Sequence, residues 1–303
     1  MKTLHEMLRD LIKRGGTELH LRSNAAPMIR TGSDLVPLDY ARFDRGDIEH
    51  LLTTSFPSSV VSASQRGEPI AHSWYHRGVG RFSMTCIRDQ FGAPAVFVRR
   101  VHDWSDESAT FLPERTDTAE PGLYLIGGRS GSGRTTVLAA CVERHVRDNS
   151  GSVLVVNDDS FPYSGSERVT LVTPKIGREI LTTTGRVFGS YDVVAFDDSY
   201  GPASLEVMLT LCRRGLVVFA TCFGQDGTDA LRNIVDEFPE LERSRIREQL
   251  SRSLRWVLTL VSIPRLKREP AFIYEVLGGT PEVRDMLKVG RYDNIEKIVA
   301  RDD

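Results

Sequence analysis

The stretch LYLIGGRSGSGRTTVLAACVERHV, residues 123–146, decides the fold of the second half of this 303-residue chain. It begins with a short apolar run, continues through a loop rich in glycine and serine, and ends in a segment with helical apolar spacing. Strand, turn and helix in this order build parallel α/β sheets. Further apolar runs follow downstream, VLVV at 153, DVVAF at 192 and LVVFATC at 216. Continuous apolar strands of this kind predict an α/β core with both faces of its sheet covered.

The loop GRSGSGRT, residues 128–135, has the spacing of the phosphate-binding motif GxxxxGK[ST], with arginine in the place of lysine. In that motif the backbone N–H groups of the loop and the N-terminus of the following helix bind phosphate, and the Ser or Thr hydroxyl coordinates Mg²⁺. We therefore predict ATP or ADP with Mg²⁺ as cofactors; the alternative is a glycine-rich turn that binds nothing. The predicted nucleotide-binding residues are Gly128, Ser130, Gly131, Ser132, Gly133, Arg134, Thr135 and Thr136. The planar guanidinium of Arg134 cannot reproduce the point contact of lysine with the β- and γ-phosphates, so catalysis is expected to suffer.

Two of the apolar runs end in pairs of aspartates, Asp158 with Asp159 and Asp197 with Asp198. In P-loop proteins a carboxylate at the end of a neighbouring strand holds Mg²⁺ or polarises the attacking water. Asp158, Asp159 and Asp198 are therefore the candidate catalytic residues, and Thr135 and Asp198 the candidate Mg²⁺ ligands. The alternative is that these aspartates only form turns or cap helices.

The first hundred residues follow a different pattern. Five apolar residues at helical spacing predict an opening helix that Gly15 and Gly16 end: Leu4, Met7, Leu8, Leu11 and Ile12. Short strand-like and helical runs come next, which predicts a smaller α+β domain over residues 1–101. Residues 102–120 carry charges, Ser, Thr and Pro without periodicity, and are expected to be a linker to the α/β domain at 121–303.

Composition excludes several classes of function. The chain has 39 Lys and Arg against 41 Asp and Glu, a net charge of −2, so no long-range positive field attracts nucleic acid or an anionic bilayer. No apolar run approaches the roughly 18 residues of a membrane helix, and charges interrupt the N-terminal segment where a signal peptide needs an apolar core. We expect a cytoplasmic protein without a nucleic-acid partner or direct membrane insertion.

Six segments, taken together and in order, resemble the retraction ATPases of type IV pili, the PilT and PilU family of the type II/IV secretion ATPases. They are GGTELHLRSNAAPMIR at 15–30, GRFSMTCIRDQFGAPAVFVRR at 80–100, GLYLIGGRSGSGRTT at 122–136, TDALRNIVDEFP at 228–239, SLRWVLTLVSIPR at 253–265 and PEVRDMLKVGR at 281–291. The resemblance implies a PAS-like N-terminal domain, a RecA-like core and assembly into a ring, usually a hexamer, alone or with a PilT/PilU-like paralogue. It also implies contact with the inner-membrane platform protein of a pilus, and so a peripheral place at that membrane.

The departures from the family pattern lie where the family carries out its chemistry. The acidic box that resembles EDPIE in the family reads NDDSF at 157–161, without glutamate, and the TLHTN histidine box reads TCFGQ at 221–225. The resemblance with these losses predicts a hydrolysis-poor pseudo-ATPase that modulates pilus retraction in twitching motility. The alternatives are a genuine Mg-ATP-hydrolysing retraction motor and, less well supported, a small-molecule P-loop kinase. Arg81 and Arg88 are expected to reach nucleotide only if the two domains close.

Overall fold

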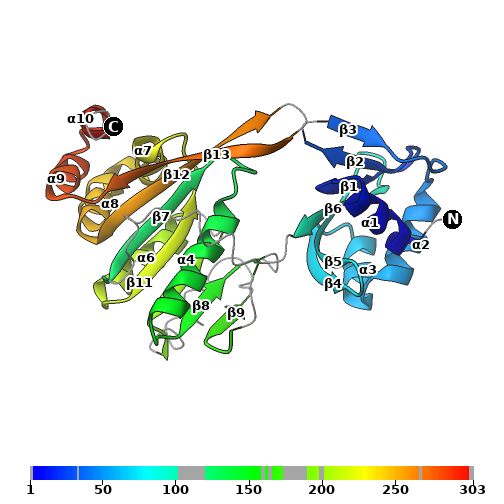
Figure 1. Ribbon diagram of the computed structural model, residues 1–303, viewed down its shortest axis with the longest axis horizontal. Helices are drawn as coiled ribbons and strands as arrows, with labels where there is room; N and C mark the ends of the chain where they lie inside the picture. Colours follow the sequence, from blue (N-terminus) through cyan, green and yellow to red (C-terminus); the bar gives the residue numbers. More distant parts are fainter. Residues whose placement is uncertain are drawn as a thin grey trace. The chain divides into compact units, whose positions relative to one another are not determined.

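The computed structural model describes residues 3–32, 34–101, 120–157, 161–162, 166–172, 190–197, 201–265 and 268–299. The chain divides into two compact units, Met1–Asp103 and Trp104–Asp303 (Figure 1). The predicted linker lies outside the described residues except for Glu120, so its limits stay a prediction.

The first unit is a six-stranded antiparallel sheet packed against three helices. Its elements are α1 (Leu4–Lys13), β1 (Glu18–Leu21), β2 (Met28–Thr31), β3 (Asp34–Pro37), α2 (Arg45–Ser55), α3 (Ser58–Gln65), β4 (Ile70–His76), β5 (Gly80–Arg88) and β6 (Pro94–Val101). The strand order is β3-β2-β1-β6-β5-β4. The opening helix forms as predicted, because Thr3 and Glu6 make a capping box at its start and its apolar stripe is buried. Alternate residues of β5, Phe82, Met84 and Cys86, face the core, as in a sheet with one solvated face.

The second unit is a seven-stranded sheet with helices on both faces. Its elements are β7 (Gly122–Gly128), α4 (Arg134–Asp148), β8 (Val153–Val156), β9 (Val169–Val172), β10 (Val193–Phe196), α6 (Pro202–Arg213), β11 (Val217–Cys222), α7 (Gly227–Asp236), α8 (Glu240–Ser253), β12 (Leu254–Arg265), β13 (Arg268–Gly278), α9 (Pro281–Val289) and α10 (Tyr292–Val299). The strand order is β13-β12-β7-β11-β10-β8-β9, with parallel pairing throughout except between β12 and β13. The predicted α/β class is confirmed.

Strand β7, which leads into the glycine-rich loop, lies inside this sheet between β11 and β12. Its side chains alternate between two cores: Leu123 and Leu125 pack with helices α6 to α10, and Tyr124 and Ile126 pack with α4. Every residue of β7 is buried, as the continuous apolar run predicts for a sheet covered on both faces. The loop therefore follows directly from a strand that is buried along its whole length.

The helix predicted over residues 242–255 ends earlier in the structure, at Ser253. The run at 242–255 predicts a helix with Ile246, Leu250 and Leu254 on one face, and α8 buries Ile246 and Leu250 completely. Leu254 instead begins β12, with φ −63° and ψ 128°. The apolar and β-branched run WVLTLV that follows favours a strand, and it pairs with β7 from Leu254 onward.

In the part of the chain that the structure describes, no helix is long and apolar enough to cross a lipid bilayer.

Candidate nucleotide-binding site

The glycine-rich loop joins the end of β7 to the start of α4. Gly133 caps α4 with φ 96° and ψ 14°, a left-handed conformation that favours glycine. Gly128 is required for a steric reason, because a Cβ there would lie 2.3 Å from Ser132 Oγ and 3.0 Å from the carbonyl oxygen of Leu260. These glycines let the chain turn tightly into the N-terminus of α4, where unpaired N–H groups and the helix dipole favour an anion.

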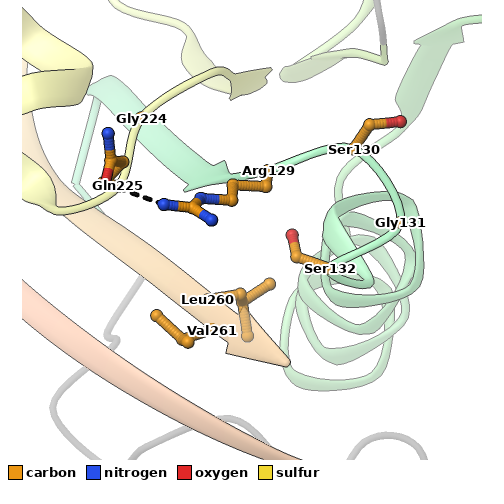
Figure 2. Close-up of a pocket in the computed structure, with 8 residues that line it drawn as sticks. All are labelled: Arg129, Ser130, Gly131, Ser132, Gly224, Gln225, Leu260 and Val261. Atoms are coloured by element: carbon orange, nitrogen blue, oxygen red, sulfur yellow. Dashed lines mark hydrogen bonds between the residues drawn. The ribbon is translucent and has the colours of Figure 1, made fainter. Parts of the chain in front are cut away.

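The loop borders a pocket of about 440 Å³ at the carboxyl end of the sheet (Figure 2). Its walls are Arg129, Ser130, Gly131 and Ser132 from the loop, Gly224 and Gln225 after β11, and Leu260 and Val261 from β12. Arg129 reaches across the pocket, and its Nη2 donates a hydrogen bond to Gln225 Oε1 at 2.9 Å. Ser132 is 3% exposed, and its Oγ has no hydrogen-bond partner among the described residues. Ligands of open α/β sheets bind in crevices at this end of the strands.

Asp197, the first residue after β10, is the centre of a buried cluster of hydrogen bonds. Thr135 Oγ1 and Thr221 Oγ1 both donate to Asp197 Oδ1 at 3.2 Å. Asn157 Nδ2 donates to Asp197 Oδ2 at 3.4 Å. The carboxyl ends of β8, β10 and β11 meet at one sheet edge, so these side chains converge on the first turn of α4. A loop hydroxyl beside a strand-end carboxylate is the pair that holds Mg²⁺ in P-loop proteins.

Arg134, which occupies the place of the motif lysine, is held by the end of β11. Its Nη1 donates to the carbonyl oxygen of Cys222 at 2.9 Å, and its guanidinium carbon lies 4.0 Å from the centroid of the Phe223 ring. The residue is only 7% exposed. A guanidinium in a cation–π contact and a charge-assisted hydrogen bond is fixed in place. In this structure Arg134 therefore ties α4 to β11, whereas the motif lysine extends toward phosphate.

The structure places the eight predicted residues together at the end of β7, in the loop that follows and in the first turn of α4, and their contact with nucleotide stays a prediction. Asp158, Asp159 and Asp198 lie outside the described residues. Their chain neighbours Asn157 and Asp197 are described, and these two are in contact. Asp197 is a carboxylate that contacts Thr135. The sequence predicts Asp198 as the Mg²⁺ ligand beside Thr135, and because Asp198 lies outside the described residues this stays a prediction.

The residues present fit a magnesium nucleotide. The buried Ser132 Oγ is without a partner among the described residues, and the missing Cβ of Gly128 leaves room for a tight phosphate-binding turn. Thr135 and Asp197 would hold Mg²⁺, and the N–H groups of the loop would bind phosphate oxygens. When bound, the metal ion neutralises charge on the phosphates.

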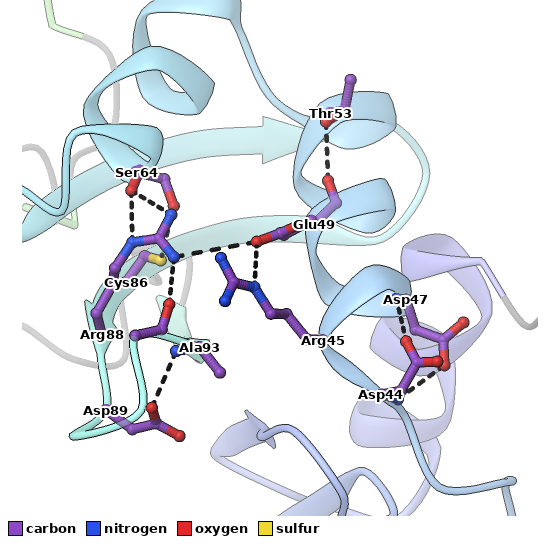
Figure 3. A network of polar contacts seen from close by, with 11 residues as sticks. Asp44, Arg45, Asp47, Glu49, Thr53, Ser64, Cys86, Arg88, Asp89 and Ala93 are labelled. Atoms are coloured by element: carbon purple, nitrogen blue, oxygen red, sulfur yellow. Dashed lines mark hydrogen bonds and ion pairs between the residues drawn. The ribbon is translucent and has the colours of Figure 1, made fainter.

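Arg88, considered above as a residue that could reach nucleotide, is engaged inside the first unit (Figure 3). Its Nε and Nη2 donate to the carbonyl oxygen of Ser64 at 2.8 and 2.6 Å, and its Nη1 donates to the carbonyl oxygen of Gly92. Glu49 lies 4.0 Å from Nη1. These contacts join α3 to the β5–β6 turn and give Arg88 a structural role in its own unit.

The sheet order, the glycine-rich loop and the Thr135–Asp197 pair are features that P-loop proteins share. Within that class the chain is similar to the pilus retraction motor PilT. A solved structure of PilT with bound ADP superposes with a TM-score of 0.82 at 20% identity, covering 98% of this chain and 89% of that one.

Sequence comparison agrees with the structural likeness. The type IV pilus retraction ATPase PilT of Pseudomonas aeruginosa is 23% identical over 295 residues, 93% of this chain and 84% of PilT. The type IV pilus ATPase PilU of the same organism is 20% identical over 311 residues, 98% of this chain and 80% of PilU. No family model matches the chain. The resemblance and the PilT-like fold inferred from the sequence are confirmed.

Proposed function

We propose that this chain is a nucleotide-binding, hydrolysis-poor accessory protein of a type IV pilus or a related secretion system, and that it modulates pilus retraction. The observation that carries the proposal is the position of Arg134, held by the carbonyl of Cys222 and the ring of Phe223. A cation held there does not follow the γ-phosphate as it is transferred.

Two losses in the sequence support the same conclusion. The acidic box at 157–161 contains no glutamate, and no histidine follows His145. A residue that orients and deprotonates water contributes about 10²–10⁴-fold to rate. Without a glutamate to activate water and without the lysine that contacts the γ-phosphate, the site is suited to binding nucleotide and hydrolysing it slowly.

The proposal includes ADP or ATP with Mg²⁺ as ligands, on the support of the Thr135–Asp197 contact and the glycine-rich turn. It also includes assembly into a hexameric ring, alone or with a PilT/PilU-like paralogue, on the cytoplasmic side of the platform protein. The likeness to PilT and PilU over nearly the whole chain supports this assembly.

A second candidate is a genuine retraction motor that hydrolyses Mg-ATP. The retained pair of Thr135 and Asp197 is compatible with this function, because a motor requires Mg²⁺ just as the accessory protein proposed above does.

Gene replacement separates the two functions. In a strain that lacks every other retraction ATPase, we expect the native chain to restore no twitching. In a strain with its retraction ATPase intact, deletion of this gene should change retraction, and the native gene should reverse the change. A Thr135→Ala form should fail to do so, and Arg252→Ala, on the exposed face of α8, should succeed. Full retraction driven by the native chain alone would identify it as a motor.

A further inference from the structure

Because Arg134 is held against the end of β11, a different cation of the loop could bind phosphate. The loop and first turn at 128–136 contain two cationic residues, Arg129 and Arg134. Arg134 is buried against Cys222 and Phe223. Arg129 is exposed, lines the pocket and points its guanidinium into it (Figure 2).

We propose that Arg129 is the phosphate-binding cation of this site, in place of the residue at the motif lysine position. This inference rests on the nucleotide binding proposed above and adds the residue that provides its charge. The guanidinium lies between the loop and the end of β11, at the mouth of the turn whose N–H groups would bind the same phosphates. A guanidinium suits this role because its planar fork binds phosphate oxygens in pairs.

Gln225 is the positioning residue for Arg129. Its Oε1 accepts a hydrogen bond from Arg129 Nη2 at 2.9 Å, and the backbone N–H of Gln225 is fixed in turn by Asp229 Oδ2 at 2.9 Å. Arginine has five N–H donors, so Nη2 can stay on Gln225 while other donors bind phosphate. Holding the long side chain in the pocket before binding lowers the entropy lost when the ligand arrives.

Ser132 gives a second and independent sign that a ligand belongs here. The side chain is 3% exposed, yet its Oγ has no partner in the part of the chain that the structure describes. Buried hydroxyl groups are normally hydrogen-bonded, so an orphaned one on a residue that lines the same pocket as Arg129 indicates a polar ligand on the pocket side. Phosphate oxygens, which accept from both groups, provide that partner.

Calorimetric titration of the full chain with Mg-ADP and with Mg-pyrophosphate tests the assignment. We expect Arg129→Ala to weaken binding of both by about tenfold to a hundredfold, since a hydrogen bond to a charged group is lost. Arg129→Lys should recover only part of this loss. Arg252→Ala, which removes the same charge from a distant exposed site, should stay within about twofold of the native chain.

A double-mutant cycle tests the role of Gln225. Gln225→Ala should weaken Mg-ADP binding about threefold in the native background and leave it unchanged when Arg129 is already alanine. An equal effect in both backgrounds overturns the positioning role. If the native chain binds and Arg129→Ala binds equally well, the Arg129 assignment is wrong while the proposed function stands. If the native chain binds neither ligand at millimolar concentration, the proposed function and this inference are both wrong.

Discussion

Thr135 Oγ1 donates a hydrogen bond to Asp197 Oδ1 at 3.2 Å, and so links the first turn of α4 to the end of β10. The strand that leads to the loop, β7, and the strand that ends at Asp197, β10, are not neighbours, because β11 lies between them. Thr221 at the end of β11, the strand between them, donates a hydrogen bond to the same carboxylate oxygen. The candidate nucleotide-binding site is therefore assembled by strand order, from residues far apart in sequence.

The Mg²⁺ dependence of nucleotide binding should require this pair. Asp197→Asn removes the negative charge with little change in shape, so Mg-ADP should bind about as weakly as ADP does in excess chelator. Titration with and without Mg²⁺ checks this. Asp148→Asn, an exposed carboxylate at the other end of α4, is the matched control and should keep the full Mg²⁺ effect. Equal Mg²⁺ effects in Asp197→Asn and the native chain would show that Asp197 does not serve the metal.

The glycines of the loop should differ in their tolerance of alanine. Gly128→Ala places a Cβ 2.3 Å from Ser132 Oγ, so the turn must open and ADP binding should be lost. In Gly131→Ala the new Cβ has no atom within 4 Å, so the only cost is backbone strain from the φ of +78°, about 1–2 kcal/mol. Comparison of the two variants by ADP titration and thermal unfolding separates steric closure of the site from general instability. Equal ADP affinities would contradict the tight-turn geometry.

Arg134 should contribute to stability. Arg134→Ala removes a charge-assisted hydrogen bond and a cation–π contact, a loss of about 1.5–3 kcal/mol from the hydrogen bond. In a unit of this size, that corresponds to a fall of roughly 3–12 °C in the Tm of its unfolding transition. The exposed ion pair of Arg252 with Glu248 is the control, and its loss should change Tm by at most a few degrees. An unchanged Tm for Arg134→Ala would mean that the contact with β11 does not hold.

The first unit should lose stability as the pH falls below about 6.5. Burial, with the neighbouring His5, lowers the pKa of His76 below 6.5, and Trp74 Nε1 donates to its Nδ1 at 3.3 Å while its Nε2 lies 3.0 Å from His5 Nδ1. The unfolded chain then binds more protons than the folded one, so stability rises with pH through this range. Denaturant unfolding of the native chain and of His76→Gln at pH 7.5 and 5.5 checks this, since the variant should show a smaller difference between the two pH values.

The strand, loop and helix at 123–146 could be predicted from sequence because their signals are local: apolar runs, glycine spacing and helical periodicity. The position of Asp197 on the face of β10 toward α4 could also have been predicted. Val193 and Ala195 face the core beneath α4, and alternation continues that face to Asp197.

The partners of Arg134 could not be predicted in this way. Cys222 and Phe223 lie 88 and 89 residues farther along the chain, and they meet Arg134 only because β11 pairs directly with β7. The edge strand β13 could not be predicted from its sequence pattern either. It is antiparallel to β12 at the edge of an otherwise parallel sheet, and Ile273 and Tyr274 are exposed there, so it lacks the continuous buried pattern of the other strands.

A single-turnover measurement on the purified chain decides whether binding and hydrolysis are separated here. The protein is mixed in excess with radiolabelled Mg-ATP, and bound ATP and released phosphate are followed over time for the native chain and for Arg134→Lys. We predict that ATP is retained and phosphate appears far more slowly than the roughly 1–100 per second of ordinary kinases, and that Arg134→Lys does not restore this rate. Phosphate release at such rates from the native chain would contradict the proposal and identify a motor.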